Sequence, residues 1–159
     1  MKIYLASPLG FTESTKDFME RIECRLIDLG FTVINPWKIS ENEGKEILKA
    51  NNMESLYQRF KKLHEINLKI GRNNENAIKE CDIVFAVLDG VDVDSGTASE
   101  IGFGYGIGKK IYGYRGDFRL SADNLGSIVN LQVQYWIENS GGFIIMTIHD
   151  IWKIKEMKQ

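Results

Sequence analysis

Three consecutive segments decide the fold: Ile83-Val-Phe-Ala-Val-Leu88, Asp94-Ser-Gly-Thr-Ala-Ser-Glu100-Ile-Gly-Phe-Gly-Tyr-Gly106 and Lys110-Ile-Tyr-Gly-Tyr114. The first and third are short apolar runs typical of buried strands, and the first is expected at the centre of the sheet. The second is an acidic loop that leads into a helix. Because ligands of parallel α/β sheets bind beyond the carboxyl ends of the strands, we expect any chemistry to involve the carboxylates of Asp94 and Glu100.

The segment before this region continues the alternation of strands and helices. Residues 2–6 and 31–35 predict two strands on either side of a helix over 14–29, which together form a strand–helix–strand unit. The polar stretch 43–80 predicts two or three helices with an interruption near Gly71-Arg72-Asn73.

Two stretches near the end of the chain complete the pattern. Residues 128–137 fit a strand or a helix, and residues 147–157 predict a terminal helix with Thr147 as its N-cap. The whole pattern indicates the α/β class, with one parallel sheet of about five strands, Rossmann/flavodoxin-like, flanked by helices on both faces. The length suits a single domain over residues 1–159.

The composition is that of an ordinary globular protein. Hydrophobic residues make up 43% of the chain and charged residues 26%, and the net charge of −2 does not favour nucleic acid as a partner. No apolar run approaches the roughly 18 residues of a membrane-spanning helix, and the first residues lack a secretion-signal pattern, so we expect a cytoplasmic protein. Cys24 and Cys81 lack the spacing of metal ligands, and we expect neither a metal nor a cofactor.

Two further patterns have structural interpretations. The alternating glycines at 102, 104, 106 and 108 do not match the spacing of a dinucleotide-binding loop, and they predict close packing of their helix against the sheet or a partner helix. Arg115, Asp117 and Arg119 are interpreted as a loop ion pair that contributes little to stability.

Local sequence leaves two interpretations of Glu100. Thr97-Ala-Ser-Glu100 matches a helix capping box, in which Glu100 bonds back to the Thr97 amide and performs no chemistry. Alternatively, a carboxylate in the first helical turn is kept ionised by the helix dipole, as a covalent nucleophile requires. Asp94 likewise either makes a turn with backbone amides or joins Glu100 in a two-carboxylate site of the kind that cleaves glycosides. The local pattern alone favours the cap.

Five blocks of the chain carry a wider pattern: Lys2-Ile-Tyr-Leu-Ala-Ser-Pro-Leu-Gly-Phe11, Asn74-x3-Ile78-x3-Asp82-Ile-Val, Asp94-Ser-Gly-Thr-Ala-Ser-Glu100-Ile-Gly, Gly113-Tyr-Arg-Gly-Asp-Phe-Arg119 and Val129-Asn-Leu131. Together they resemble the nucleoside 2-deoxyribosyltransferase family over nearly the whole chain. The resemblance implies an enzyme of nucleoside metabolism and salvage. Such an enzyme exchanges the base of a 2′-deoxynucleoside for a free purine or pyrimidine through a covalent deoxyribosyl-enzyme intermediate.

The resemblance also implies roles for residues around the sugar. Glu100 would be the nucleophile at C1′, and the Tyr4 hydroxyl would position its carboxylate. Asp94 would bind the 5′-hydroxyl or the base. Asn130 matches an asparagine that a neighbouring subunit delivers to the 5′-hydroxyl, which implies a homo-oligomer of at least two chains.

The base pocket is implied by a second set of residues. Phe11 and Trp37 are candidate walls, and Ser7 is a further candidate for substrate binding. Asn74 stands where some members carry an aspartate that helps to protonate the leaving base. Because an amide cannot supply that proton, Asn74 would only hydrogen-bond, and Asp94 or water remains as the acid.

Two other functions remain open. Related deoxynucleoside 5′-monophosphate N-hydrolases tend to carry serine at the positions of Asp94 and Asn130 and an arginine in the first loop, which residues 7–11 lack. The Asp94 carboxylate would repel a 5′-phosphate but accept a hydrogen bond from a 5′-hydroxyl, which favours free nucleosides. The other candidate is a non-catalytic nucleoside or nucleotide sensor, and the presence of Tyr4, Asp94 and Glu100 together argues against it.

Overall fold

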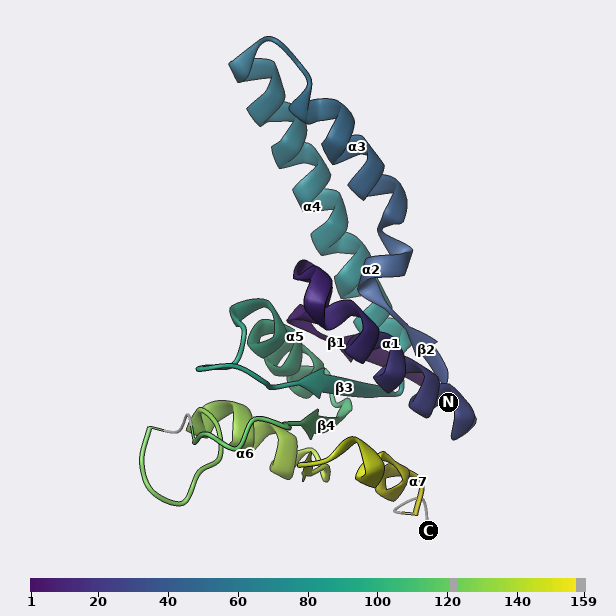
Figure 1. Ribbon diagram of the computed structural model, residues 1–159, viewed down its shortest axis with the longest axis vertical. Helices are drawn as coiled ribbons and strands as arrows, with labels where there is room; N and C mark the ends of the chain where they lie inside the picture. The colour runs from purple at the N-terminus through teal and green to yellow at the C-terminus, as the bar shows by residue number, and fades with distance from the viewer. Residues whose placement is uncertain (121–122, 157–159) are drawn as a thin grey trace.

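The computed structural model describes residues 1–120 and 123–156 of the chain. They form one five-stranded sheet in which every pair of neighbouring strands is parallel, in the order β2-β1-β3-β4-β5. The strands are β1 (Lys2–Ala6), β2 (Thr32–Ile34), β3 (Ile83–Val87), β4 (Lys110–Tyr114) and β5 (Ile144–Ile145). The α/β class, the parallel sheet and the central position of β3 are therefore confirmed (Figure 1).

Helices cover both faces of the sheet. They are α1 (Glu13–Asp28), α2 (Pro36–Ile39), α3 (Glu41–Asn51), α4 (Leu56–Glu80), α5 (Ser95–Gly106), α6 (Leu131–Asn139) and α7 (Lys153–Glu156), with 3-10 turns η1 (Pro8–Phe11) and η2 (Ile148–Trp152). On one face, Ile22 of α1 and Ile151 of η2 share an apolar core with Phe85. On the other face, α4, α5 and α6 bury a second core that includes Tyr4 and Val84.

Two of the four alternating glycines, Gly102 and Gly104, permit the close packing that their spacing predicts, whereas a Cβ at Gly106 or Gly108 would meet open space. A Cβ at Gly104 would lie 2.9 Å from the Val84 side chain of β3, and a Cβ at Gly102 would lie 3.0 Å from Trp136 of α6. Each glycine costs about 1 kcal/mol of helix propensity relative to alanine. The approach to the sheet and to α6 brings α5, and the side chains it carries, directly onto β1 and β3.

Helices α3 and α4 form a hairpin that extends well beyond the sheet (Figure 1). The predicted interruption near Gly71-Arg72-Asn73 is wrong, because α4 runs unbroken from Leu56 to Glu80 and the break falls at residues 52–55 instead. Ser55 caps α4 by accepting a hydrogen bond from the Gln58 amide at 3.4 Å. A single glycine does not end a helix whose carboxyl-terminal half is anchored to the sheet through buried Ala77 and Ile78.

The end of the chain differs most from expectation. Residues 128–137, which fitted a strand or a helix, contribute to helix α6. The fifth strand lies at Ile144–Ile145, where two paired residues leave no recognisable periodicity in the sequence. Thr147 does cap, but it caps η2, so the predicted helix is a 3-10 turn followed by α7, and its last residue, Met157, lies outside the described residues. No helix of residues 1–120 and 123–156 is long and apolar enough to cross a membrane.

Candidate active site

Three polar side chains meet on the sheet face that α4 and α5 cover. Tyr4 of β1 is fully buried, and its hydroxyl donates a hydrogen bond to Glu100 Oε1 at 2.6 Å. From α4, Asn74 Nδ2 donates to the same oxygen at 3.4 Å. Since successive strand residues point to opposite faces, Tyr4 projects toward α5 while Ile3 and Leu5 enter the other core. We call Tyr4, Asn74 and Glu100 the glutamate cluster.

Burial controls the charge of Glu100. The pKa of this carboxyl is raised from 4.5 to about 7: removal from water is the largest cause, the hydrogen bond from Tyr4 opposes it, and the negative charge of Asp94 adds to it. Burial, together with the neighbouring Glu100 charge, raises the pKa of Tyr4 far above its ordinary value. Tyr4 therefore remains a hydrogen-bond donor, while Glu100 changes its charge close to neutral pH.

The capping-box interpretation of Glu100 is wrong. Helix α5 begins at Ser95 with Asp94 as its N-cap, and Asp94 Oδ2 accepts hydrogen bonds from the Thr97 amide at 2.9 Å and the Thr97 hydroxyl at 3.3 Å. Glu100 consequently lies in the second turn rather than the first, where the helix dipole has little effect. Its carboxylate is available to the glutamate cluster because Asp94 satisfies the orphan amide of Thr97.

Asn74 has one buried atom without a partner. Its Oδ1 accepts no hydrogen bond from the described residues, although its Nδ2 faces Glu100. A buried acceptor left unsatisfied costs about 1–3 kcal/mol. Asn74 can therefore accept a hydrogen bond from a ligand that reaches this position.

Ser7, Phe11 and Trp37 form a second group at the carboxyl end of β1. Ser7 Oγ caps η1 by accepting from the Leu9 amide at 3.2 Å, and its carbonyl accepts from Trp37 Nε1 at 3.1 Å. The rings of Phe11 and Trp37 meet edge to face, with centroids 4.6 Å apart. A Cβ at Gly10 would lie 2.3 Å from the indole, so Trp37 packs directly on the glycine backbone. Within the described residues, no hydrogen bond or ring contact joins this group to the glutamate cluster.

Asn130 lies apart from both groups within this chain. It is the N-cap of α6, and its Oδ1 accepts from the amides of Gln132 at 3.0 Å and Val133 at 3.3 Å. Its Nδ2 donates to Asp123 Oδ2 at 3.2 Å. Asn130 therefore fixes the start of α6, and its expected contribution to a neighbouring subunit remains a prediction.

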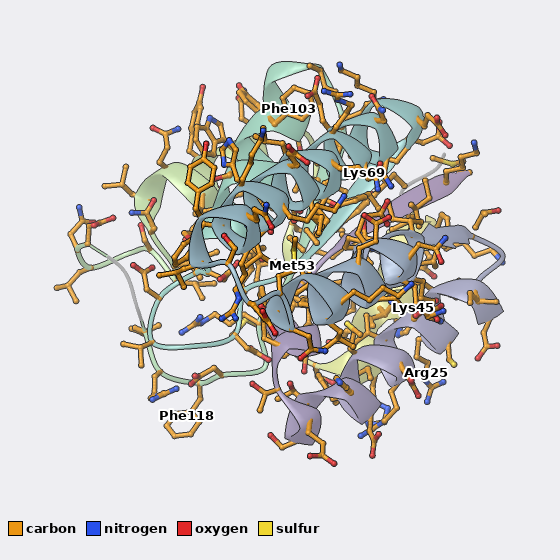
Figure 2. The ribbon with its side chains drawn as sticks, turned by 90° about the horizontal axis from the view of Figure 1, so that it is seen from above. Arg25, Lys45, Met53, Lys69, Phe103 and Phe118 are labelled. Atoms are coloured by element: carbon orange, nitrogen blue, oxygen red, sulfur yellow. The ribbon has the colours of Figure 1, made fainter. Side chains whose placement is uncertain are left out.

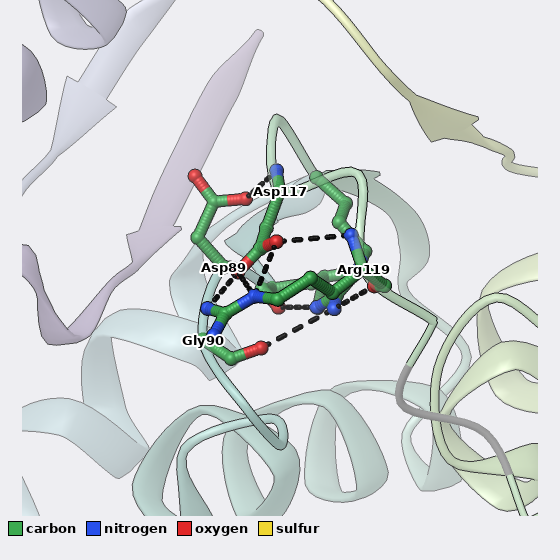
Figure 3. Close-up of polar contacts among 6 residues, drawn as sticks. Asp89, Gly90, Asp117 and Arg119 are labelled. Carbon is green, nitrogen blue, oxygen red and sulfur yellow. Dashed lines mark hydrogen bonds and ion pairs between the residues drawn. The ribbon is translucent and has the colours of Figure 1, made fainter.

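The loop after β4 contains a contact that the sequence did not reveal. Asp117 and Arg119 form the predicted ion pair, which holds the pKa of the Asp117 carboxyl well below its usual range. Arg115 instead is fully buried and donates to backbone carbonyls of the loop after β3 (Figure 3). The position of Arg115 directly after an apolar strand was the sequence signal that could have indicated its burial. Among residues 1–120 and 123–156, no group of three or more His, Cys, Asp or Glu side chains is placed to hold a metal ion.

Comparison with known proteins identifies the family. The family model for nucleoside 2-deoxyribosyltransferases matches residues 3–132. The chain belongs to the nucleoside 2-deoxyribosyltransferase family. The matched residues run from β1 into α6 and include the whole glutamate cluster. A search of curated proteins gave no match.

Solved structures agree with this membership. A 2-deoxyribosyltransferase from the psychrotolerant bacterium Bacillus psychrosaccharolyticus is 29% identical, with a TM-score of 0.66 over 96% of this chain and 90% of its own. Two more distant structures share the fold. A conserved protein from Enterococcus faecalis V583 is 21% identical, with a TM-score of 0.70 over 100% of this chain and 99% of its own. A CMP N-glycosidase from Clostridium botulinum is 18% identical, with a TM-score of 0.57 over 98% and 99%.

Membership of the nucleoside 2-deoxyribosyltransferase family confirms the resemblance stated from the sequence. It makes this chain a member of a family of glycosyl-handling enzymes that act on nucleosides. The reaction that this particular chain performs is a separate question, which depends on its own side chains.

Proposed function

We propose that this protein transfers 2-deoxyribose between nucleobases through a covalent intermediate on Glu100. The observation that carries the proposal is the partly buried Glu100 carboxylate, one oxygen of which is held by the Tyr4 hydroxyl at 2.6 Å. No described residue hydrogen-bonds to the other oxygen, Oε2, which leaves it available for attack on carbon. Membership of the nucleoside 2-deoxyribosyltransferase family supports the same reaction.

The chemistry follows from an ionised carboxylate beneath the sugar ring. As the bond between C1′ and the base nitrogen breaks, its electron pair leaves with the base, which takes up a proton, and Glu100 Oε2 bonds to C1′. A nitrogen of the second base then attacks C1′ on the face that the first base left and releases its proton to water. The glutamyl ester breaks, the carboxylate is regenerated, and the new nucleoside keeps the original configuration after two inversions.

Tyr4 orients this nucleophile. Its hydrogen bond favours the ionised carboxylate and opposes the effect of burial, so that a useful fraction of Glu100 is charged near neutral pH. Because Tyr4 itself stays protonated, it can donate this bond throughout the reaction.

Asp94 is proposed to bind the sugar's 5′-hydroxyl or the base. Its Oδ2 is occupied by Thr97, while its Oδ1 accepts no hydrogen bond from the described residues. A negative charge here attracts a hydroxyl donor and repels a 5′-phosphate, which supports free nucleosides as substrates. A charged Asp94 has no proton to give, so in this role of Asp94 water would supply the proton for the leaving base.

The remaining candidates are proposed to bind the substrate. The unpartnered Oδ1 of Asn74 suits an N–H donor of the base, and the exposed edges of Phe11 and Trp37 suit a flat ring beside Ser7. Asn130 would reach the 5′-hydroxyl in the site of a neighbouring copy, so the active form would be at least a dimer. We also propose that the enzyme works in the cytoplasm and needs no cofactor.

A base-exchange assay tests the proposal directly. Incubation with deoxyadenosine and free hypoxanthine should yield deoxyinosine and adenine. Release of free deoxyribose without exchange would indicate a hydrolase instead, and binding without turnover of any deoxynucleoside would indicate a sensor. Repeating the assay with deoxyadenosine 5′-monophosphate tests the argument from Asp94.

Replacement of the proposed nucleophile, Glu100, is compared with replacement of an exposed glutamate. Glu100→Ala should abolish exchange and leave the fold intact. The control is Glu65→Ala, which removes an exposed glutamate from α4 and should change nothing. Undiminished exchange by the Glu100 variant would rule out the assigned nucleophile.

A further inference from the structure

Arg115 joins two loops at the carboxyl edge of the sheet. The guanidinium is completely buried and donates from Nη1 to the Leu88 carbonyl at 2.5 Å. Its Nη2 donates to the Gly90 carbonyl at 3.2 Å and to the Arg119 carbonyl at 2.6 Å (Figure 3). The first two carbonyls belong to the loop between β3 and α5, and the third belongs to the loop after β4.

The burial of this charge requires an explanation. No carboxylate among the described residues lies within ion-pair distance of Arg115, and its Nε has no partner. A buried charge is costly unless it is well compensated, and here three carbonyl dipoles and the nearby charge of Asp117 provide the compensation. The rigid planar fork of arginine can bind several carbonyls at once, which the single ammonium of lysine cannot do in the same geometry.

Other contacts hold the same two loops together. Asp89 Oδ1 accepts a hydrogen bond from the Asp117 amide at 2.9 Å, and the Asp117 side chain is fixed in turn by Arg119. Gly90 has a φ of +132°, a conformation that other residues rarely adopt, which allows its carbonyl to face Arg115. By contrast, Phe118 between these residues is 91% exposed and points away from the molecule (Figure 2). The loop after β4 is therefore held by Arg115 and the Asp89–Asp117 contact, not by burial of Phe118.

We propose that Arg115 is the positioning residue that sets the place of Asp94, and with it the binding of the sugar's 5′ end. The loop that Arg115 holds at Leu88 and Gly90 ends at Asp94, the N-cap of α5. Only residues 91–93 separate Gly90 from Asp94, and of these Val93 is itself buried in the core of this face. The role given to Asp94 rests on the proposed function, whereas the fixing of the loop by Arg115 does not.

Steady-state kinetics with two substrates test the positioning role. Arg115→Lys keeps the positive charge but loses the fork, and we expect KM for deoxyadenosine to rise about tenfold, as for the loss of a hydrogen bond of about 1.4 kcal/mol, while kcat per folded molecule changes less. For 2′,5′-dideoxyadenosine, which has no 5′-hydroxyl, variant and wild type should have nearly equal KM. The control is Arg59→Lys, since Arg59 also donates to a backbone carbonyl, that of Met53, but on the α3–α4 hairpin. An equal rise of KM for both substrates, or no rise for either, would overturn the proposal.

Amide hydrogen exchange tests the loop without any turnover. In Arg115→Lys, amides of residues 89–98 should exchange at least about tenfold faster than in wild type, while those of α1 keep their protection. If Arg115→Lys does not fold, Gly90→Ala disturbs the same contact from the other loop and should give the same result. Unchanged protection of the amides of residues 89–98 in a folded variant would refute the proposal that Arg115 holds this loop. Absence of base exchange by the wild-type protein would refute the proposed function instead, and the amide data would still decide whether Arg115 holds the loop.

Discussion

Replacement of Tyr4 by Phe should move the acidic limb of activity to higher pH. The pKa of Glu100 is about 7, raised mainly by burial and already lowered by the hydrogen bond from Tyr4. The bond is short, at 2.6 Å, and its acceptor is charged, so its net contribution is about 1.5–3 kcal/mol. Since one pH unit corresponds to about 1.4 kcal/mol, loss of the bond should raise the pKa of Glu100 by about one to two pH units.

The assay is the pH profile of kcat/KM for base exchange. Because the nucleophile must be ionised, wild-type activity should rise with pH and level off above about pH 7, whereas Tyr4→Phe should level off about one to two pH units higher. At about pH 6 the variant should therefore be about ten- to a hundredfold slower from ionisation alone. At high pH this part of the defect should disappear, and any remaining loss reports the orientation of Glu100.

A second tyrosine provides the control for this experiment. Tyr112 is equally buried but lies in the core on the opposite face of the sheet. Tyr112→Phe should leave the midpoint of the profile in place. An unchanged or lower midpoint in Tyr4→Phe would refute the argument that Tyr4 stabilises the ionised carboxylate.

Three further changes have definite expected outcomes. Asp94→Asn removes the negative charge that raises the pKa of Glu100, so the acidic limb should move to lower pH, opposite to Tyr4→Phe, and an upward movement in the same assay would contradict the electrostatic argument. Because the pKa of Glu100 rises from 4.5 to about 7 on folding, ionisation destabilises the folded protein, and wild-type stability should fall by about 3 kcal/mol relative to Glu100→Gln as pH rises through that window. Urea unfolding at a series of pH values measures this difference, and parallel curves for the two proteins would refute it. Gly10→Ala would place a methyl group 2.3 Å from the Trp37 ring, so the indole must move and KM for the nucleoside should rise. Tryptophan fluorescence reports the movement of the indole, and Trp37→Phe identifies the part of the signal that comes from Trp37. If the indole is displaced but KM for the nucleoside is unchanged, Trp37 does not line the base pocket.

Helix boundaries show where local sequence reasoning was sufficient and where it failed. Apolar periodicity, which depends on near neighbours in the chain, correctly predicted the strand β4 at Lys110–Tyr114 and the helix α1. The two-residue strand at Ile144–Ile145 gives no such signal, since it exists only because it pairs with β4. A Cβ at Gly142 would lie 1.6 Å from the Ile111 carbonyl, so this glycine permits the chain to pass closely beside β4. That contact is long-range and cannot be deduced from the local pattern.

Apolar patterning alone predicted that Asp94 and Glu100 follow the central strand of a parallel sheet, and the five sequence blocks indicated the family. The contacts that each carboxylate makes within the chain depend on the folded arrangement. Asp94 caps α5, and Glu100 turns to Tyr4, a partner 96 positions away in the sequence. The same applies to Arg115, which was expected in a loop ion pair and instead binds carbonyls across two loops. The physical reason is that strand and helix periodicity arises from neighbouring residues, whereas the partner of a buried polar group depends on which faces the fold brings together.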